Sequence, residues 1–133
     1  MAIFLLDTSV IIDALNNKRE RKTLLLEMLE AGHTLACCPI NITEVYAGMR
    51  PTEEAETENF LYSLQLFPTT WPVAKLAGEL KRDYKQKGIS LNLADLIIAA
   101  TALHNNLTLL TDNIKDFPMK DITLYPLPGQ TKK

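Results

Sequence analysis

The chain lacks long hydrophobic runs and any cysteine pattern that would tie a small fold together. Among its 133 residues, no apolar stretch reaches the roughly 18 residues that a membrane span needs, and its first residues lack the basic start of a secretory signal. The two cysteines, Cys37 and Cys38, are neighbours, which favours neither a disulfide framework nor a zinc site. We therefore expect a protein of the reducing cytoplasm.

A strong excess of one charge is also missing. The 14 lysines and arginines nearly balance the 16 aspartates and glutamates, for a formal net charge of −2. This balance argues against a protein that holds nucleic acid by bulk positive charge alone, although it leaves nucleic acid possible as a substrate. With five glycines and no glycine-rich loop ending in Gly-Lys-Ser/Thr, a nucleotide-binding loop is disfavoured.

What is present suffices for one globular domain. Hydrophobic residues make up 47% of the chain and charged residues 23%, the usual balance of a soluble domain. We expect this single domain to span residues 1–125. Residues 126–133 contain two prolines, a glycine and two final lysines, which predicts a flexible C-terminal tail.

Short apolar runs alternate with helical patterns along the chain. Strands are predicted at Ala2–Leu6, Thr34–Cys38, Leu66–Thr70, Leu107–Leu110 and Ile122–Tyr125. Helices are predicted at Val10–Leu15, Thr23–Ala31, Asn41–Ala47, about Thr52–Leu66, Pro72–Lys87 and Asn92–Leu103. This alternation predicts an α/β domain with a mainly parallel sheet.

Several acids stand where such a sheet binds ligands. Asp7 closes the first strand, Glu44 lies in the first turn of the helix after the second, and Asp112 follows the fourth. Because the carboxyl ends of parallel strands share one edge, we expect these three acids to converge. Asp95 joins them only if its helix starts at that same edge and runs back across the sheet.

Helix capping is the simpler interpretation of each acid taken alone. Glu44 and Asp95 each follow an asparagine by three residues, as in a capping box, and Asp7 could cap the helix after it. Asp7 and Asp95, however, lie among apolar residues with no Lys or Arg near them in sequence. An isolated buried charge costs several kcal/mol, so a cluster of such acids needs a divalent cation or raised pKa values.

Oxygen ligands select hard cations such as Mg²⁺ or Mn²⁺ over zinc. A hard cation in an acidic pocket can bind phosphate, activate a water and stabilise the leaving oxygen of a phosphodiester. The composition of the site thus suggests metal-dependent phosphoryl chemistry.

Four segments carry a recognisable pattern in a fixed order: Phe4–Ile12, Asn41–Gly48, Leu93–Ala102 and Leu109–Phe117. Together they resemble the motifs of PIN-domain (PilT N-terminus) ribonucleases, especially the VapC toxins of toxin–antitoxin pairs. The resemblance implies a three-layer α/β/α sandwich with a central, mainly parallel sheet of four to five strands. It also implies a Mg²⁺- or Mn²⁺-dependent endonuclease that cleaves single-stranded RNA.

By motif match, Asp7, Glu44 and Asp95 are the catalytic, metal-binding acids. We expect Asp7 and Asp95 to hold one cation directly, with Glu44 as a further ligand or as the base for the attacking water. Thr8 or Ser9 would support the site.

The fourth motif leaves one choice open. Thr111 would orient a carboxylate or a water, and family members often carry Asp or Asn two places later, where this chain has Asn113. Asp112 and Asp116 are therefore rivals for the fourth catalytic and metal-binding position.

The resemblance implies partners as well. A cognate antitoxin would lay a helix in an apolar groove and place an arginine on the acids, and the toxin would form a homodimer. The segment Phe60–Phe67 carries more apolar bulk than a surface helix needs. Arg50 is the candidate RNA contact, while the basic runs Lys18–Lys22 and Lys81–Lys85 are more simply interpreted as solvated faces.

Two other functions stay open at this point. A receiver-like signalling domain also uses acids and Mg²⁺ on a small α/β fold, but this chain has no adjacent acidic pair after its first strand and no lysine after its last. A PIN-like protein that binds RNA or a partner, with weak catalysis, would result if the fourth acid were missing.

Overall fold

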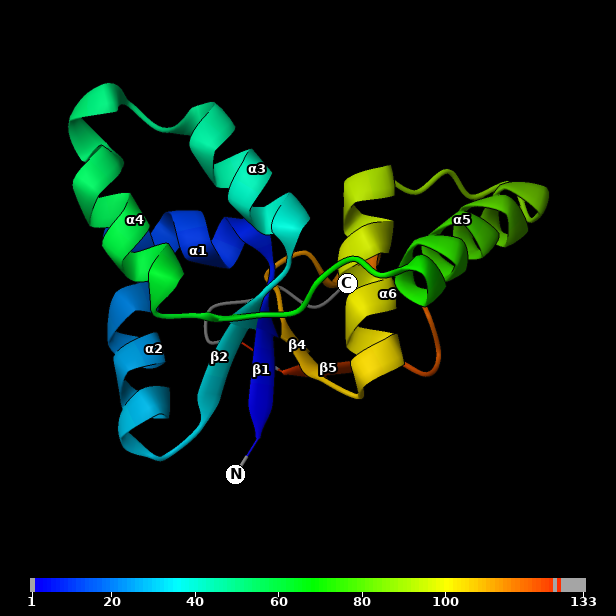
Figure 1. Ribbon diagram of the computed structural model, residues 1–133. Helices are drawn as coiled ribbons and strands as arrows, with labels where there is room; N and C mark the ends of the chain where they lie inside the picture. The colour runs from blue at the N-terminus through cyan, green and yellow to red at the C-terminus, as the bar shows by residue number, and fades with distance from the viewer. Residues whose placement is uncertain (1, 126, 128–133) are drawn as a thin grey trace.

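The computed structural model describes residues 2–125 and Leu127 (Figure 1). The strands are β1 (Ile3–Leu6), β2 (Thr34–Cys37), β3 (Gln65–Leu66), β4 (Thr108–Leu110) and β5 (Thr123–Tyr125). The α-helices are α1 (Thr8–Leu15), α2 (Arg21–Glu30), α3 (Pro39–Gly48), α4 (Glu54–Tyr62), α5 (Trp71–Gln86) and α6 (Leu93–Asn105), with short 3₁₀ turns η1 (Pro51–Glu53) and η2 (Ile114–Asp116). The tail predicted at 126–133 lies outside the described residues except for Leu127, so that boundary stays a prediction.

The five strands form one sheet in the order β3-β2-β1-β4-β5, and every neighbouring pair is parallel. This arrangement, with helices on both faces, confirms the predicted three-layer α/β/α sandwich. The central strands β1 and β4 come from opposite ends of the chain, and Leu6 of β1 pairs with Leu110 of β4. All strands therefore end at one edge, where the segments after β1 and β4 lie side by side.

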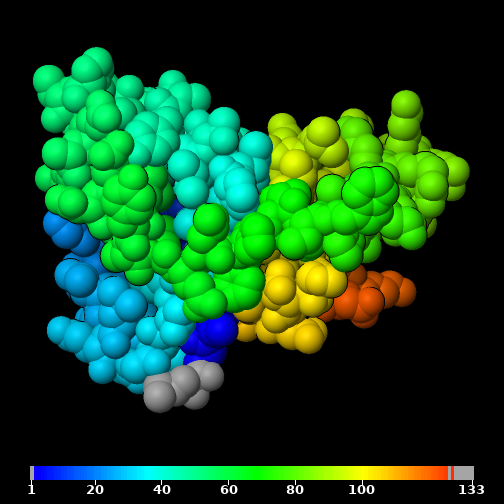
Figure 2. Space-filling view, in the orientation of Figure 1, coloured from blue at the N-terminus to red at the C-terminus, as the bar shows by residue number. Residues whose placement is uncertain are grey.

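Alternation along β1 divides its side chains between two cores. Leu5 packs with residues of α5 and α6 on one face, while Phe4 and Leu6 pack with residues of α1, α2 and α3 on the other. All three are buried, which explains why the first strand reads as a continuous apolar run. The segment between α4 and α5 crosses the front of the molecule and joins the two helical layers (Figures 1 and 2).

The structure differs from the predicted elements most between residues 50 and 70. The helix predicted at Thr52–Leu66 is divided into η1 and α4 and ends at Tyr62. The third strand is the two-residue edge strand β3, and Pro68 explains its shortness because proline cannot donate to a strand ladder.

Cys37 and Cys38 are both free and buried. Among the described residues, no helix has the length and apolar character to cross a membrane.

Candidate active site

Asp7 lies at the carboxyl edge of the sheet, between the ends of β1 and β4. Its backbone N–H donates to the Leu110 carbonyl oxygen at 2.9 Å, which ties the two strand ends together. The Thr8 N–H donates to Asp7 Oδ1 at 2.8 Å, and Thr111 Oγ1 donates to Asp7 Oδ2 at 2.7 Å. The residue is only 4% exposed, so its carboxylate is buried and fixed at both oxygens.

Glu44 reaches the same edge from α3 through a short chain of hydrogen bonds. Thr8 Oγ1 donates to Glu44 Oε1 at 2.6 Å and itself accepts a hydrogen bond from Asn41 Nδ2 at 2.9 Å. The other end of the buried Asn41 amide accepts from the Cys38 N–H at 2.8 Å. Thr8 therefore orients Glu44, and its role in supporting an active site stays a prediction.

These contacts also correct the capping interpretation of Glu44. The helix α3 begins at Pro39, not at Asn41, so Glu44 lies beyond its first turn. The Asn41 side chain instead caps the start of α3, by accepting the hydrogen bond from the Cys38 N–H. The role of Asn41 in holding Thr8 was missed by sequence reasoning, although a polar residue shortly before Glu44 in an apolar stretch was the available signal.

Asp95 and Asp116 complete a group of four carboxylates, which we call the acidic cluster: Asp7, Glu44, Asp95 and Asp116. Asp95 lies in the first turn of α6, whose start is capped by the Asn92 side chain on the Ala94 N–H at 2.8 Å. Helix α6 thus starts at the carboxyl edge, which is the condition for Asp95 to join the other acids.

The electrostatics of the cluster show that its members act on one another. Burial raises the pKa of Asp7, hydrogen bonds from Thr111 and Thr8 lower it, and the charges of Glu44 and Asp116 raise it again. Burial, followed by the charges of Asp7, Asp116 and Glu44, raises the pKa of Asp95 to about 6. Two of the four acids therefore bind a proton more readily than an isolated carboxyl group, and a nearby positive charge would favour their ionised forms.

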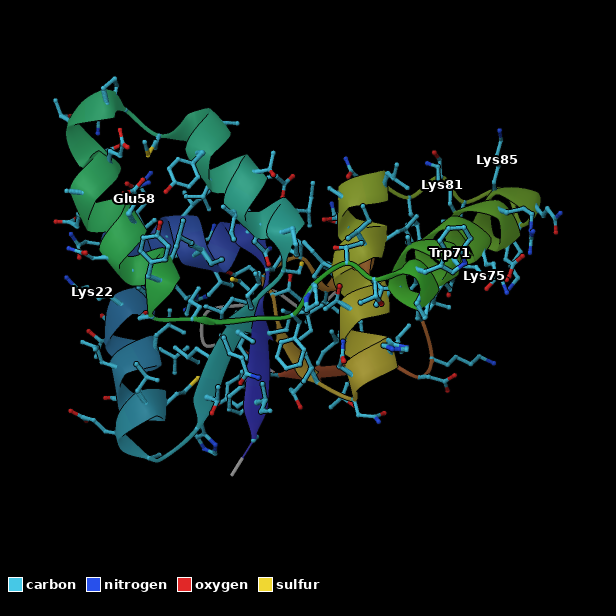
Figure 3. The ribbon with its side chains drawn as sticks, in the orientation of Figure 1. Lys22, Glu58, Trp71, Lys75, Lys81 and Lys85 are labelled. Carbon is cyan, nitrogen blue, oxygen red and sulfur yellow. The ribbon has the colours of Figure 1, made fainter. Side chains whose placement is uncertain are left out.

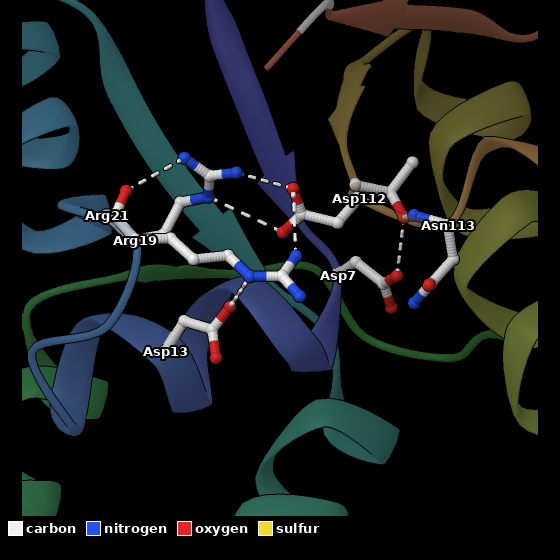
Figure 4. Close-up of polar contacts among 7 residues, drawn as sticks. Asp7, Asp13, Arg19, Arg21, Asp112 and Asn113 are labelled. Carbon is white, nitrogen blue, oxygen red and sulfur yellow. Dashed lines mark hydrogen bonds and ion pairs between the residues drawn. The ribbon is translucent and has the colours of Figure 1, made fainter. Parts of the chain in front are cut away.

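Asp112, the other rival for the fourth position, is engaged elsewhere. Its Oδ1 contacts Arg21 Nη2 at 2.5 Å and Arg19 Nη1 at 3.7 Å, and its Oδ2 accepts from Arg21 Nε at 3.4 Å (Figure 4). The Arg21 and Asp112 side chains are 3% and 6% exposed. The structure thus brings Asp116 to the other acids and Asp112 to an arginine.

The remaining supporting residues differ in what they contact. The Asn113 N–H donates to Thr111 Oγ1 at 2.9 Å, so its backbone helps to orient Thr111. Ser9 Oγ is buried without a hydrogen-bond partner among the described residues, and its supporting role stays a prediction.

The basic residues are spread over several elements. Lys22 on α2 and Lys81 and Lys85 on α5 lie on opposite sides of the molecule (Figure 3). Arg50 is exposed beyond the end of α3, with its Nη2 3.1 Å from Glu53 Oε2, and its contact with RNA stays a prediction. For Arg21 the expectation of a solvated face is wrong, since the residue is only 2% exposed.

The donor set of the acidic cluster fits a hard divalent cation. All four side chains offer carboxylate oxygens, and their mutual repulsion is of the kind that such a cation relieves. Asp7 and Glu44 are already oriented by hydrogen bonds. Within the described part of the chain, no three His, Cys, Asp or Glu side chains stand close enough together to enclose an ion as they are placed.

The fold is a parallel α/β/α sandwich, and its acids gather at the edge of the sheet where β1 and β4 end. These two features place the chain among small α/β proteins with an acidic site at the carboxyl edge of the sheet. The family model of the PIN domain matches residues 4–121, and the chain belongs to this family. The membership confirms the resemblance carried by the four motifs.

Relatives and solved structures agree with this assignment. The chain is 32% identical over 115 residues to Ribonuclease VapC19 of Mycobacterium tuberculosis, covering 86% of this chain and 92% of the relative. It is 31% identical over 120 residues to Ribonuclease VapC2 of Rickettsia felis, covering 86% and 90%. Among structures, VapBC2 from Rickettsia felis bound to a promoter DNA fragment aligns with a TM-score of 0.80 at 28% identity, covering 92% and 97%. A toxin–antitoxin complex from Klebsiella pneumoniae aligns with a TM-score of 0.71 at 30% identity, covering 99% and 97%.

Proposed function

We propose that this protein is a Mg²⁺- or Mn²⁺-dependent endoribonuclease that cleaves single-stranded RNA, and that it is the cytoplasmic toxin of a VapBC-type toxin–antitoxin pair. The observation that carries the proposal is the convergence of Asp7, Glu44, Asp95 and Asp116, with the pKa values of two of them raised. The names of the relatives, which are VapC ribonucleases, support it.

In this proposal each residue of the site has a distinct task. Asp7 and Asp95 hold the cation, while Asp116 contributes the fourth negative charge. When bound, the cation supplies a Lewis acid that polarises the phosphodiester and makes a water more acidic. Glu44, held by Thr8, accepts the proton of the attacking water or serves as a further ligand. Thr111 keeps the Asp7 carboxylate in place through its 2.7 Å hydrogen bond.

An apolar pocket supports the antitoxin part of the proposal. It lies between α1, α3 and the start of α4, where the apolar residues Ile12, Leu15, Val45 and Met49 line it and the polar residues at its margin include Glu53 and Glu56. An amphipathic helix of a partner could bury its apolar face there. Within the bulky segment Phe60–Phe67, Leu61 and Leu64 belong to the core, whereas Tyr62 and Leu66 are exposed and available to a partner or a second copy. The homodimer stays a prediction.

Membership of the PIN domain family removes the support for the receiver-like alternative. A PIN-like protein with weak catalysis remains as an outcome of the test below.

The proposal is tested with purified protein and a labelled single-stranded RNA, with duplex RNA and single-stranded DNA for comparison. We expect cleavage of the single-stranded RNA with Mn²⁺ or Mg²⁺ and none with chelator. Asp7→Asn and Asp95→Asn should each lower the rate at least about a hundredfold, because the loss of a metal ligand removes several kcal/mol of charge stabilisation.

Asp83→Asn on α5 is the matched control, an exposed acid outside the cluster, and should cleave like the parent. If the parent binds RNA without cutting it, the weak-catalysis alternative holds. Equal rates for Asp95→Asn and the parent would show that the acidic cluster is not the active site.

A further inference from the structure

Arg21 and Asp112 stand 91 residues apart in the chain and form a buried ion pair beside the acidic cluster (Figure 4). The guanidinium reaches both carboxylate oxygens, through Nη2 to Oδ1 and Nε to Oδ2. Its Nη1 also donates to the Arg19 carbonyl oxygen at 3.1 Å. One side chain thus links the loop between α1 and α2 to the segment that follows β4.

The linked segment, residues 111–116, carries two residues of the site. Thr111 donates to Asp7, and Asp116 is the last residue of η2, with its charge acting on both Asp7 and Asp95. The turn between them is held by the Asn113 N–H on Thr111 Oγ1 and by the Asp116 N–H on the Asn113 carbonyl oxygen, both at 2.9 Å. Asp112, next to Thr111, is the residue of this turn that Arg21 binds.

We infer that Arg21 is a positioning residue: its pairing with Asp112 fixes residues 111–116 so that Thr111 reaches Asp7 and Asp116 stays near the other three acids of the cluster. Asp112 then serves the site through Arg21 and is not a ligand of the cation. The inference rests on the proposed function, because it concerns the geometry of the proposed metal site.

Two physical reasons favour this assignment. A cation that took Asp112 as a ligand would have to break the contacts between Asp112 and Arg21, and separating a buried ion pair is costly. A free Asp112 would also add a further negative charge beside acids that already repel one another. Pairing with Arg21 removes both problems at once.

The loop that delivers Arg21 adds a second observation. Arg19 and Glu20, the two residues before it, have φ of 54° and 55°, in the left-handed region that side chains rarely adopt. Such a conformation persists only where surrounding contacts determine it. The contacts of Arg21 with Asp112 and with the Arg19 carbonyl oxygen are contacts of this kind.

The test compares Arg21→Lys, Asp112→Asn and the double variant with Asp116→Asn and with the control Lys22→Met, an exposed neighbour on α2. Each variant is measured for single-stranded RNA cleavage and, separately, for the rise in Tm on addition of Mn²⁺. Circular dichroism at the assay temperature establishes that each variant is folded.

We expect both single substitutions to lower kcat by about tenfold to a hundredfold, because small displacements of site residues have effects of this size. KM should change less than about threefold, since a pair buried to this degree offers little surface to a bound RNA. The kcat of the double variant should be no lower than that of the less active single variant, because both substitutions break the same contact. Arg21→Lys and Asp112→Asn should keep a rise in Tm with Mn²⁺, whereas Asp116→Asn should lose most of it.

The inference is overturned if Asp112→Asn loses the rise in Tm as completely as Asp116→Asn while Arg21→Lys behaves like the parent. Asp112 would then be a ligand that acts without Arg21. Additive losses in the double variant would overturn it as well. If Arg21→Lys does not fold, the Tm of Asp112→Asn is the test. A rise with Mn²⁺ supports the inference, and the loss of that rise overturns it. Failure of the proposed function is separate, since a parent that cuts no RNA still reports metal binding through its Tm.

Discussion

The acidic cluster and the Arg21–Asp112 pair lie at the same edge of the sheet but handle buried charge in opposite ways. Asp112 is matched by a guanidinium that is itself buried, so its charge is compensated within the fold. Asp7 is held by neutral donors, and the charges that act on it and on Asp95 are those of other carboxylates. The ion pair thus holds two segments of the chain together, whereas the proposed metal site would need a bound cation to balance its charges.

Removing Arg21 should produce the largest effect. In Arg21→Met, Asp112 loses its buried partner and keeps the exposed Arg19 guanidinium 3.7 Å away, and we expect the free energy of unfolding to fall by about 3–5 kcal/mol. Urea denaturation with chelator present measures this loss. Adding Asp112→Leu should recover most of it, since replacing both charges by apolar groups costs little. A loss below about 1 kcal/mol in the single variant would contradict a structural role for the pair.

A smaller effect should appear when the pH of the metal-free protein is changed. Because the pKa of Asp95 in the fold is about 6 and its ordinary value is 3.8, the folded state binds the proton more tightly than the unfolded state. Stability should therefore fall as the pH rises from about 4 to 6 and stay lower above that range. The raised pKa of Asp7 acts in the same direction.

Thermal unfolding between pH 4 and 8, with and without Mn²⁺, measures this dependence. The rise in Tm on addition of Mn²⁺ should be larger at pH 7.5 than at pH 5.5, because protons compete with the cation for Asp95. Asp95→Asn should flatten the metal-free profile, and an unchanged profile in that variant would assign the dependence to other groups.

The smallest effect concerns a single charge of the cluster and has the opposite sign to that of Arg21→Met. Asp95→Asn removes a charge that its surroundings disfavour, so the metal-free protein at pH 7.5 should become more stable. The gain should stay below about 1 kcal/mol because Asp95 is only half-buried and solvent screens it. Urea denaturation with chelator measures it, and Asp83→Asn serves as the exposed control. A loss of stability would mean that Asp95 is a structural acid.

Much of the fold could be predicted because burial determines the sequence pattern of the central elements. The apolar run of β1 reflects strands covered on both faces, and the face of α5 with Val73 and Ala77 packs into the core. The edge region was harder, since β3 is short and its two residues are exposed, so no burial pattern marks it.

A site residue could be predicted only where its position in a predicted strand or helix determines its place in the fold. Asp7 follows the end of β1 and Asp95 lies in the first turn of α6, whereas Glu44 lies further along α3; the charges of all three act on one another. The choice between Asp112 and Asp116 depends on the turn after β4, which is held by a residue 91 positions away. Local sequence contains no sign of that contact, and a basic run such as Lys18–Lys22 is normally solvated.

The pairing of β1 with β4 has a consequence for how the protein is made. Synthesis begins at the N-terminus, so Asp7 and Glu44 leave the ribosome long before Asp95, Thr111 and Asp116. The central strand β1 lacks β4 beside it until Leu110 has been added, and the Asp7–Thr111 contact spans 104 positions. A growing chain that ends before Thr111 therefore contains Asp7 and Glu44 but lacks the residues that complete the site. The Asp7–Thr111 contact, and with it the proposed site, can form only after residues 111–116 have been synthesised.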